Sequence, residues 1–93
     1  MKIVLIGAGK VGYTLAQRLS EDNHDVIVIE QDAERIEVLR KYLEVLVVEG
    51  NGANPDLLES IGMSDTELFV AVTDADEVNL LACYVAKQLG ATQ

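Results

Sequence analysis

The chain has 93 residues, which is enough for a single domain and too short to divide between two hydrophobic cores. Its 7 Lys and Arg against 16 Asp and Glu give a formal net charge of −9, which repels a nucleic-acid backbone and argues against nucleic-acid partners. No uncharged apolar run approaches the ~18 residues of a membrane-spanning helix, so direct membrane insertion is not expected.

The first strand is expected at Lys2–Ile6, a continuous β-branched run typical of a parallel sheet that is covered on both faces. A helix follows from about residue 10 to 22, because apolar residues recur there at helical spacing, namely Val11, Leu15, Ala16 and Leu19. It ends near Asn23, which tolerates a left-handed cap. Asp25–Glu30 then repeats the pattern of the first strand.

The middle of the chain predicts a second helix, a third strand and a short third helix. Asp32 is expected to cap the second helix, which runs to about residue 43 and turns Ile36, Leu39 and Leu43 inward. The third strand is expected at 45–48. After a turn at 50–52, Asn54 caps a short helix that begins with Pro55 and stops at Gly62.

The last part of the chain predicts a fourth strand at 68–72 and a helix over 73–89 that Gly90 ends. Thr73 and Asp74 are expected to cap this helix, and Asp74 and Glu77 have the spacing of a capping box. Its apolar stripe contains Val78, Leu81, Cys83 and Val85, so Cys83 is expected to pack in the core rather than act as a nucleophile.

Alternation of four strands with four helices indicates one α/β domain spanning 1–93, a doubly wound parallel sheet in strand order 3-2-1-4. The first two helices should cover one face of the sheet and the last two the other. Strand order reverses between strands one and four, so a crevice is expected at their carboxyl ends. Residues 7–12 and Thr73-Asp74 should meet there.

Gly7, Gly9 and Gly12 form a G-x-G-x-x-G turn between a strand and a helix, the context of a Rossmann-like nucleotide site. Gly7 would permit the tight turn, Gly9 the approach of a diphosphate, and Gly12 the packing of the helix on the strand. The predicted cofactor-binding turn includes Lys10 and Val11. Lys10 could reach a phosphate, and a solvated lysine is an equal alternative.

Glu30 ends the second strand eighteen residues after Gly12, where a carboxylate accepts hydrogen bonds from the hydroxyls of an adenosine ribose and repels a 2′-phosphate. NAD is therefore preferred to NADP, whereas ATP and ADP present the same ribose. A solvated carboxylate is the alternative. Asn51 is a candidate for adenine contact or a plain turn residue, and Thr73 and Asp74 are candidates for nucleotide contact or simple helix caps.

The sequence shows no catalytic or metal-binding constellation. His24 is the single histidine and is expected in a surface loop. The one cysteine excludes an internal disulfide, and no secretion leader precedes the first strand, so a cytoplasmic location is expected. We therefore expect a binding module and not an enzyme.

Three stretches, 1–16, 47–52 and A-V-T-D-A-D-E-V-N-L-L-A at 71–82, resemble the N-terminal RCK or KTN domain of Trk-type potassium-uptake regulatory subunits. The resemblance implies a cytoplasmic, dimer-forming module that binds NAD(H), or alternatively ATP or ADP, and controls a membrane potassium transporter or channel. It places Thr73, Asp74, Glu77 and Asn79 in the family's strand-four motif. Lys10 stands where arginine is often found, and Asn51 where aspartate is common.

The family domain continues into a fifth strand, which implies that this chain is a piece of a longer protein. We expect the free edge of the fourth strand, or the last helix, to be covered by another copy in a homodimer or larger homo-oligomer. The alternative function is the cofactor-binding half of an NAD-dependent dehydrogenase, which would need a separate substrate domain.

Overall fold

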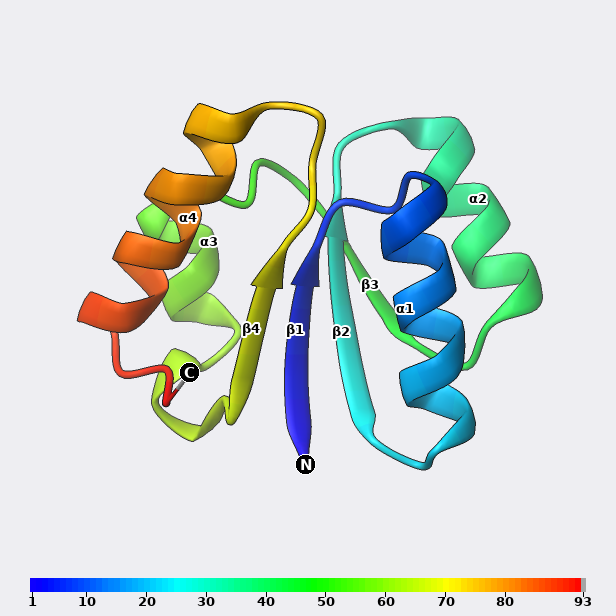
Figure 1. The fold of residues 1–93 in the computed structure, drawn as a ribbon, viewed down its shortest axis with the longest axis horizontal. Helices are drawn as coiled ribbons and strands as arrows, with labels where there is room; N and C mark the ends of the chain where they lie inside the picture. The colour runs from blue at the N-terminus through cyan, green and yellow to red at the C-terminus, as the bar shows by residue number, and fades with distance from the viewer. Residues whose placement is uncertain (93) are drawn as a thin grey trace.

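The computed structural model describes residues 1–92 and has the predicted α/β architecture (Figure 1). All strands are parallel, and the sheet has the predicted order β3-β2-β1-β4. The elements match the sequence-based bounds within a few residues, apart from a 3-10 turn, Met63–Asp65, that was not anticipated. They are β1 (Lys2–Ile6), α1 (Lys10–Glu21), β2 (Asp25–Glu30), α2 (Ala33–Tyr42), β3 (Leu46–Glu49), α3 (Pro55–Ser60), β4 (Leu68–Ala71) and α4 (Asp76–Gln88).

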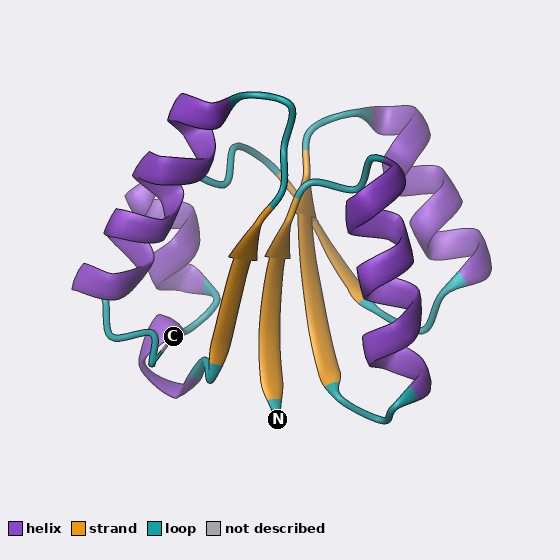
Figure 2. Ribbon diagram, in the orientation of Figure 1, coloured by secondary structure: helices purple, strands orange, loops and turns teal. Residues whose placement is uncertain are grey.

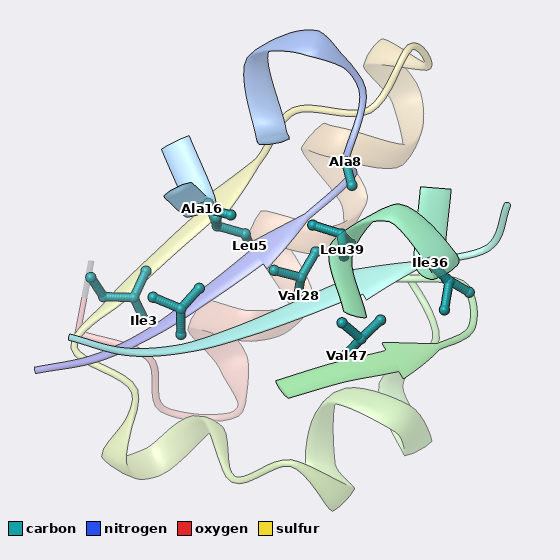
Figure 3. Close-up of a cluster of buried hydrophobic side chains, with 9 residues drawn as sticks. Ile3, Leu5, Ala8, Ala16, Val28, Ile36, Leu39 and Val47 are labelled. Atoms are coloured by element: carbon teal, nitrogen blue, oxygen red, sulfur yellow. The ribbon is translucent and has the colours of Figure 1, made fainter. Parts of the chain in front are cut away.

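Two hydrophobic layers hold the sheet, and side chains alternate between them along β1 because successive strand residues point to opposite faces. The layer under α1 and α2 contains Ile3 and Leu5 (Figure 3), and the layer under α3 and α4 contains Val4 and Ile6. Ala8 extends the first layer into the glycine turn, which is thereby anchored on the core.

The connections that follow β1, β2 and β4 lie at the same end of the sheet (Figure 2). This is the edge at which parallel α/β sheets place their ligands, since the helices on either side of the strand-order reversal diverge there. Within residues 1–92 no helix is both long enough and apolar enough to cross a membrane.

The helix caps differ in part from the prediction. Asn23 adopts a left-handed conformation with φ 64°, and the side chain of Asn54 accepts a hydrogen bond from Asp56 N–H, both as predicted. Asp32 occupies the N-cap of α2, yet its side chain makes no capping hydrogen bond. The prediction of a capping box at α4 is wrong, because the N-cap is Ala75 and no side chain caps that helix.

The expected inward faces of α1 and α4 also need correction. Val11 is 61% exposed, and Leu81 on α4 is 53% exposed. Cys83 is exposed rather than packed in the core. Helix α4 is buried through the small residues Ala82 and Ala86 instead, which leaves an apolar outer face.

Candidate functional site

The glycine turn is shaped by two close backbone approaches. Gly7 has φ +98°, and a Cβ there would lie 3.0 Å from the backbone N of Thr73. A Cβ on Gly12 would lie 2.1 Å from the carbonyl oxygen of Gly7. Only glycine fits either position without moving the backbone, so the turn after β1 is locked between the start of α1 and the end of β4.

The first turn of α1 presents its N–H groups without a side-chain cap. Gly9 is the N-cap residue, and no side chain bonds to the N–H groups that follow it, which include those of Lys10 and Val11. Unpaired N–H groups at the positive end of a helix bind anions such as phosphate. The local geometry thus fits the phosphate cradle predicted from the glycine spacing.

Glu30 is buried, with 7% exposure, so the alternative of a solvated carboxylate is wrong. Its Oε1 accepts a hydrogen bond from Ala8 N–H at 2.6 Å. Its Oε2 accepts two more, from Gln31 N–H and Asp32 N–H, each at 2.9 Å. A carboxylate has about four acceptor positions, so these three hydrogen bonds let Glu30 shape the site and leave about one position for a ligand.

Asn79 fixes the conformation of the connection between β4 and α4. Its Oδ1 accepts hydrogen bonds from the backbone N–H and the hydroxyl of Thr73, at 2.9 and 2.5 Å, and its Nδ2 donates to the Thr73 carbonyl at 3.1 Å. The Thr73 hydroxyl also accepts from Ala75 N–H at 3.2 Å. The polar residues after β4 therefore hold one another in place instead of capping α4.

These segments enclose a cavity of about 300 Å³ at the carboxyl ends of the strands. It brings together the predicted residues Gly7, Glu30, Thr73 and Asp74. A second hollow, of about 610 Å³, lies between α1 and α2 and is lined by Gly9 and Lys10.

Three predicted residues line neither hollow. Gly12 is buried beneath the turn and Val11 is exposed. The exposed Asn51 uses its Oδ1 to accept a hydrogen bond from Ala53 N–H, as a turn residue would, although the neighbouring Gly50 and Gly52 line the cavity. Within the described part of the chain, no group of three or more His, Cys, Asp or Glu side chains is arranged to hold a metal ion.

Arg35 is the residue of this region that sequence reasoning missed. It lines both hollows, and its guanidinium lies 3.7 Å from the position of a Cβ on Gly9. The available signal was its position five residues after Glu30, in the first turns of the helix that follows the second strand. A charged residue there is also typical of a solvated helix, so the sequence alone did not single it out.

Residues 3–93 match the model of the TrkA-N domain family. The chain belongs to this family. It is 54% identical over 87 residues to the Trk system potassium uptake protein TrkA homolog 2 of Methanosarcina mazei, covering 94% of this chain and 19% of that protein. It is 43% identical over 89 residues to the Trk system potassium uptake protein TrkA of Halomonas elongata, covering 96% of this chain and 20% of that protein. This TrkA-N chain thus spans about a fifth of the length of these relatives.

Solved structures share the fold of this TrkA-N domain at lower identity. The NAD(P)-binding domain of an exopolyphosphatase-related protein from Archaeoglobus fulgidus aligns with a TM-score of 0.83 and 18% identity over 95% of this chain and 65% of that one. The AMP-bound Kef C-terminal domain of Shewanella denitrificans aligns with a TM-score of 0.79 and 24% identity, over 95% of this chain and 52% of that one. An anaerobilin reductase of Escherichia coli aligns with a TM-score of 0.74 and 14% identity, over 98% of this chain and 47% of that one. These likenesses establish the Rossmann-like fold.

Proposed function

We propose that this domain is a regulatory module that binds NAD or NADH, or alternatively ATP or ADP, and thereby controls a membrane potassium transporter or channel. The observation that carries it is the hydrogen bond from Ala8 N–H to buried Glu30, which brings the glycine turn and the uncapped start of α1 next to that carboxylate. That pairing offers an anion site and a ribose acceptor, the two features by which dinucleotide-binding folds hold a nucleotide. The family supplies the link to potassium uptake.

In the orientation that we propose, the phosphates of the nucleotide lie against the first turn of α1, and a ribose hydroxyl donates to the remaining acceptor position of Glu30. Thr73 and Asp74 line the cavity with Glu30, and in this orientation the adenine extends toward Gly50 and Gly52, the neighbours of Asn51. A bound nucleotide changes the assembly only if it binds two arrangements with different affinity.

Calorimetric titration of the chain with NAD, NADH, ATP and ADP tests this proposal. Saturable binding of at least one nucleotide is expected, and inosine nucleotides serve as a control for adenine recognition. If none of the four binds at millimolar concentration, the module is not a nucleotide sensor and a purely structural role replaces it.

The proposal also covers the rest of the protein. We infer that residues 1–93 are one domain of a longer cytoplasmic protein that lies against the membrane through its transport partner. A homodimer or larger homo-oligomer is supported by the position of β4 at the sheet edge and by the exposed face of α4. We propose no enzymatic activity. Substrate-dependent oxidation of NADH by the full-length protein would instead favour the dehydrogenase alternative.

A further inference from the structure

Arg35 reaches from α2 across the mouth of the cavity to three carboxylates. Its Nη1 lies 3.9 Å from Glu30 Oε1, its Nε 3.7 Å from Asp32 Oδ2, and its Nη2 3.7 Å from Asp74 Oδ2. All three distances exceed the length of a hydrogen bond. The guanidinium is therefore held by charge among three anions without a directed donor contact to any of them.

The carboxylate partners of Arg35 differ in how firmly the rest of the structure holds them. Glu30 is tied to backbone N–H groups, whereas the side chain of Asp74 is 91% exposed and Arg35 itself is 40% exposed. An exposed ion pair contributes little stability, so the contact between Arg35 and Asp74 is easily exchanged. Asp74 lies on the connection that leads into α4, and Arg35 on the helix after β2, so this contact bridges the two sides of the cavity.

The guanidinium also lies next to the anion site. Its carbon and both terminal nitrogens are 3.7 Å from a Cβ position on Gly9, the N-cap of α1. A phosphate resting on the uncapped N–H groups of this turn is consequently a neighbour of Arg35. Arginine binds phosphate through two parallel N–H donors, which is a stronger contact than the long ion pairs seen here.

We propose that Arg35 is the side chain that recognises the phosphate of a bound adenine nucleotide, and that it exchanges Asp74 for that phosphate when the nucleotide binds. This role rests on the nucleotide-binding function proposed above and adds to it a specificity residue and a route to α4. Release of Asp74 removes the contact between Arg35 and the connection that leads into α4, the helix whose outer face is apolar and exposed.

The first test compares ADP with adenosine, which lacks the phosphates, by NMR titration of the wild-type chain and of Arg35→Gln. The variant is expected to bind ADP about tenfold more weakly and adenosine within about twofold of the wild type. Arg35→Lys, which keeps the charge but loses the fork of donors, should fall between the two. The dispersion of each spectrum shows that the variant is folded.

The second test removes the competing carboxylate. Asp74→Asn is expected to tighten ADP binding about twofold to threefold, and the effect should vanish when Arg35→Gln is also present. Asp76→Asn removes an equal charge two residues away, at a side chain that forms no ion pair with Arg35 within residues 1–92, and should change the affinity less. In the wild type, ADP but not adenosine should shift the backbone amide of Asp74.

The outcomes separate the two proposals. If the wild type binds none of NAD, NADH, ATP and ADP, the proposed function fails and the role of Arg35 fails with it. If ADP binds and Arg35→Gln leaves the ratio of ADP to adenosine affinity unchanged, only the role of Arg35 is overturned. Preference for NADP over NAD that Arg35→Gln abolishes would place the guanidinium at a 2′-phosphate, which also contradicts the exchange with Asp74.

Discussion

The carboxylate of Glu30 accepts a hydrogen bond from the backbone N–H of Ala8 at 2.6 Å, which joins the end of β2 to the middle of the glycine turn. Ala8 is itself buried in the hydrophobic layer under α1 and α2. A residue predicted to bind ribose therefore also positions the turn that we propose binds phosphate. The proposed ribose site and the proposed phosphate site are thus held together by this hydrogen bond.

Glu30→Gln should destabilise the fold, because the amide nitrogen cannot accept and at least one of three N–H donors loses its partner. An unsatisfied buried donor costs about 1–3 kcal/mol, which urea unfolding would measure. Glu49→Gln is the matched control, since Glu49 pairs with Glu30 across the ladder but is exposed. Equal unfolding free energies for the two variants would refute the positioning role of Glu30.

Asn79→Ala should loosen the connection before α4, because it removes the acceptor of Thr73 N–H and the donor to the Thr73 carbonyl. A loss of about 1–3 kcal/mol in unfolding free energy is expected, together with weaker nucleotide binding. Gln88→Ala, at an exposed position of the same helix, should change neither quantity. An Asn79 variant with wild-type stability would show that Thr73 is held by other means.

Lys2 links the start of β1 to the end of α3, where its Nζ donates to the carbonyls of Ile61 and Gly62 at 2.6 and 2.9 Å and to Asp65 at 2.7 Å. The hydrogen bond from Lys2 holds the pKa of Asp65 below its ordinary value of 3.8. Since the folded-state pKa is the lower one, the contribution of Asp65 is complete well above pH 3.8 and is lost as the pH falls through the folded-state pKa.

Asp65→Asn checks this pH dependence. The wild type should resist urea better than the variant at pH 7, and the difference between their unfolding midpoints should shrink as the pH falls below 3.8. Asp56→Asn, at an exposed position in the first turn of α3, is a control for loss of charge. A midpoint difference that grows on acidification would have the wrong sign for this pair.

The outer face of α4 should mediate self-association, since Leu80 and Tyr84 are 75% and 64% exposed. Sedimentation of the wild type at micromolar concentration is expected to show a dimer, and the double change Leu80→Ser, Tyr84→Ser a monomer. The pair Val38→Ser, Tyr42→Ser alters exposed apolar residues of α2 and should leave the dimer intact. A monomeric wild type would count against the homodimer.

The sequence predicts the structure best at positions where backbone geometry allows only one type of residue or one conformation. Gly7 and Gly12 could be assigned because no other residue tolerates their contacts, and the strands because their β-branched runs have no competing period. The strand order followed from right-handed crossovers. Each of these inferences depends on local chemistry or on a chirality rule.

The errors arise where tertiary contacts decide. Thr73 and Asp74 have the composition of helix caps, but Asn79 draws Thr73 into its own hydrogen bonds and Ala75 becomes the N-cap. Cys83 lies on a helix whose apolar residues surround it, so periodicity could not show that alanines form the buried face. The position of Arg35 depends on a long side chain crossing to another element, which no sequence period records.

An NMR map of the amide shifts that NADH and ADP cause in the wild-type chain tests nucleotide binding at the glycine turn most directly. We expect the largest shifts on Gly9, Lys10, Val11 and Gly12, at the first turn of α1, with a second group at Glu30 and Thr73. Shifts of the same size with adenosine at the glycine turn, or a largest effect on the far end of the sheet near Asp65, would contradict it.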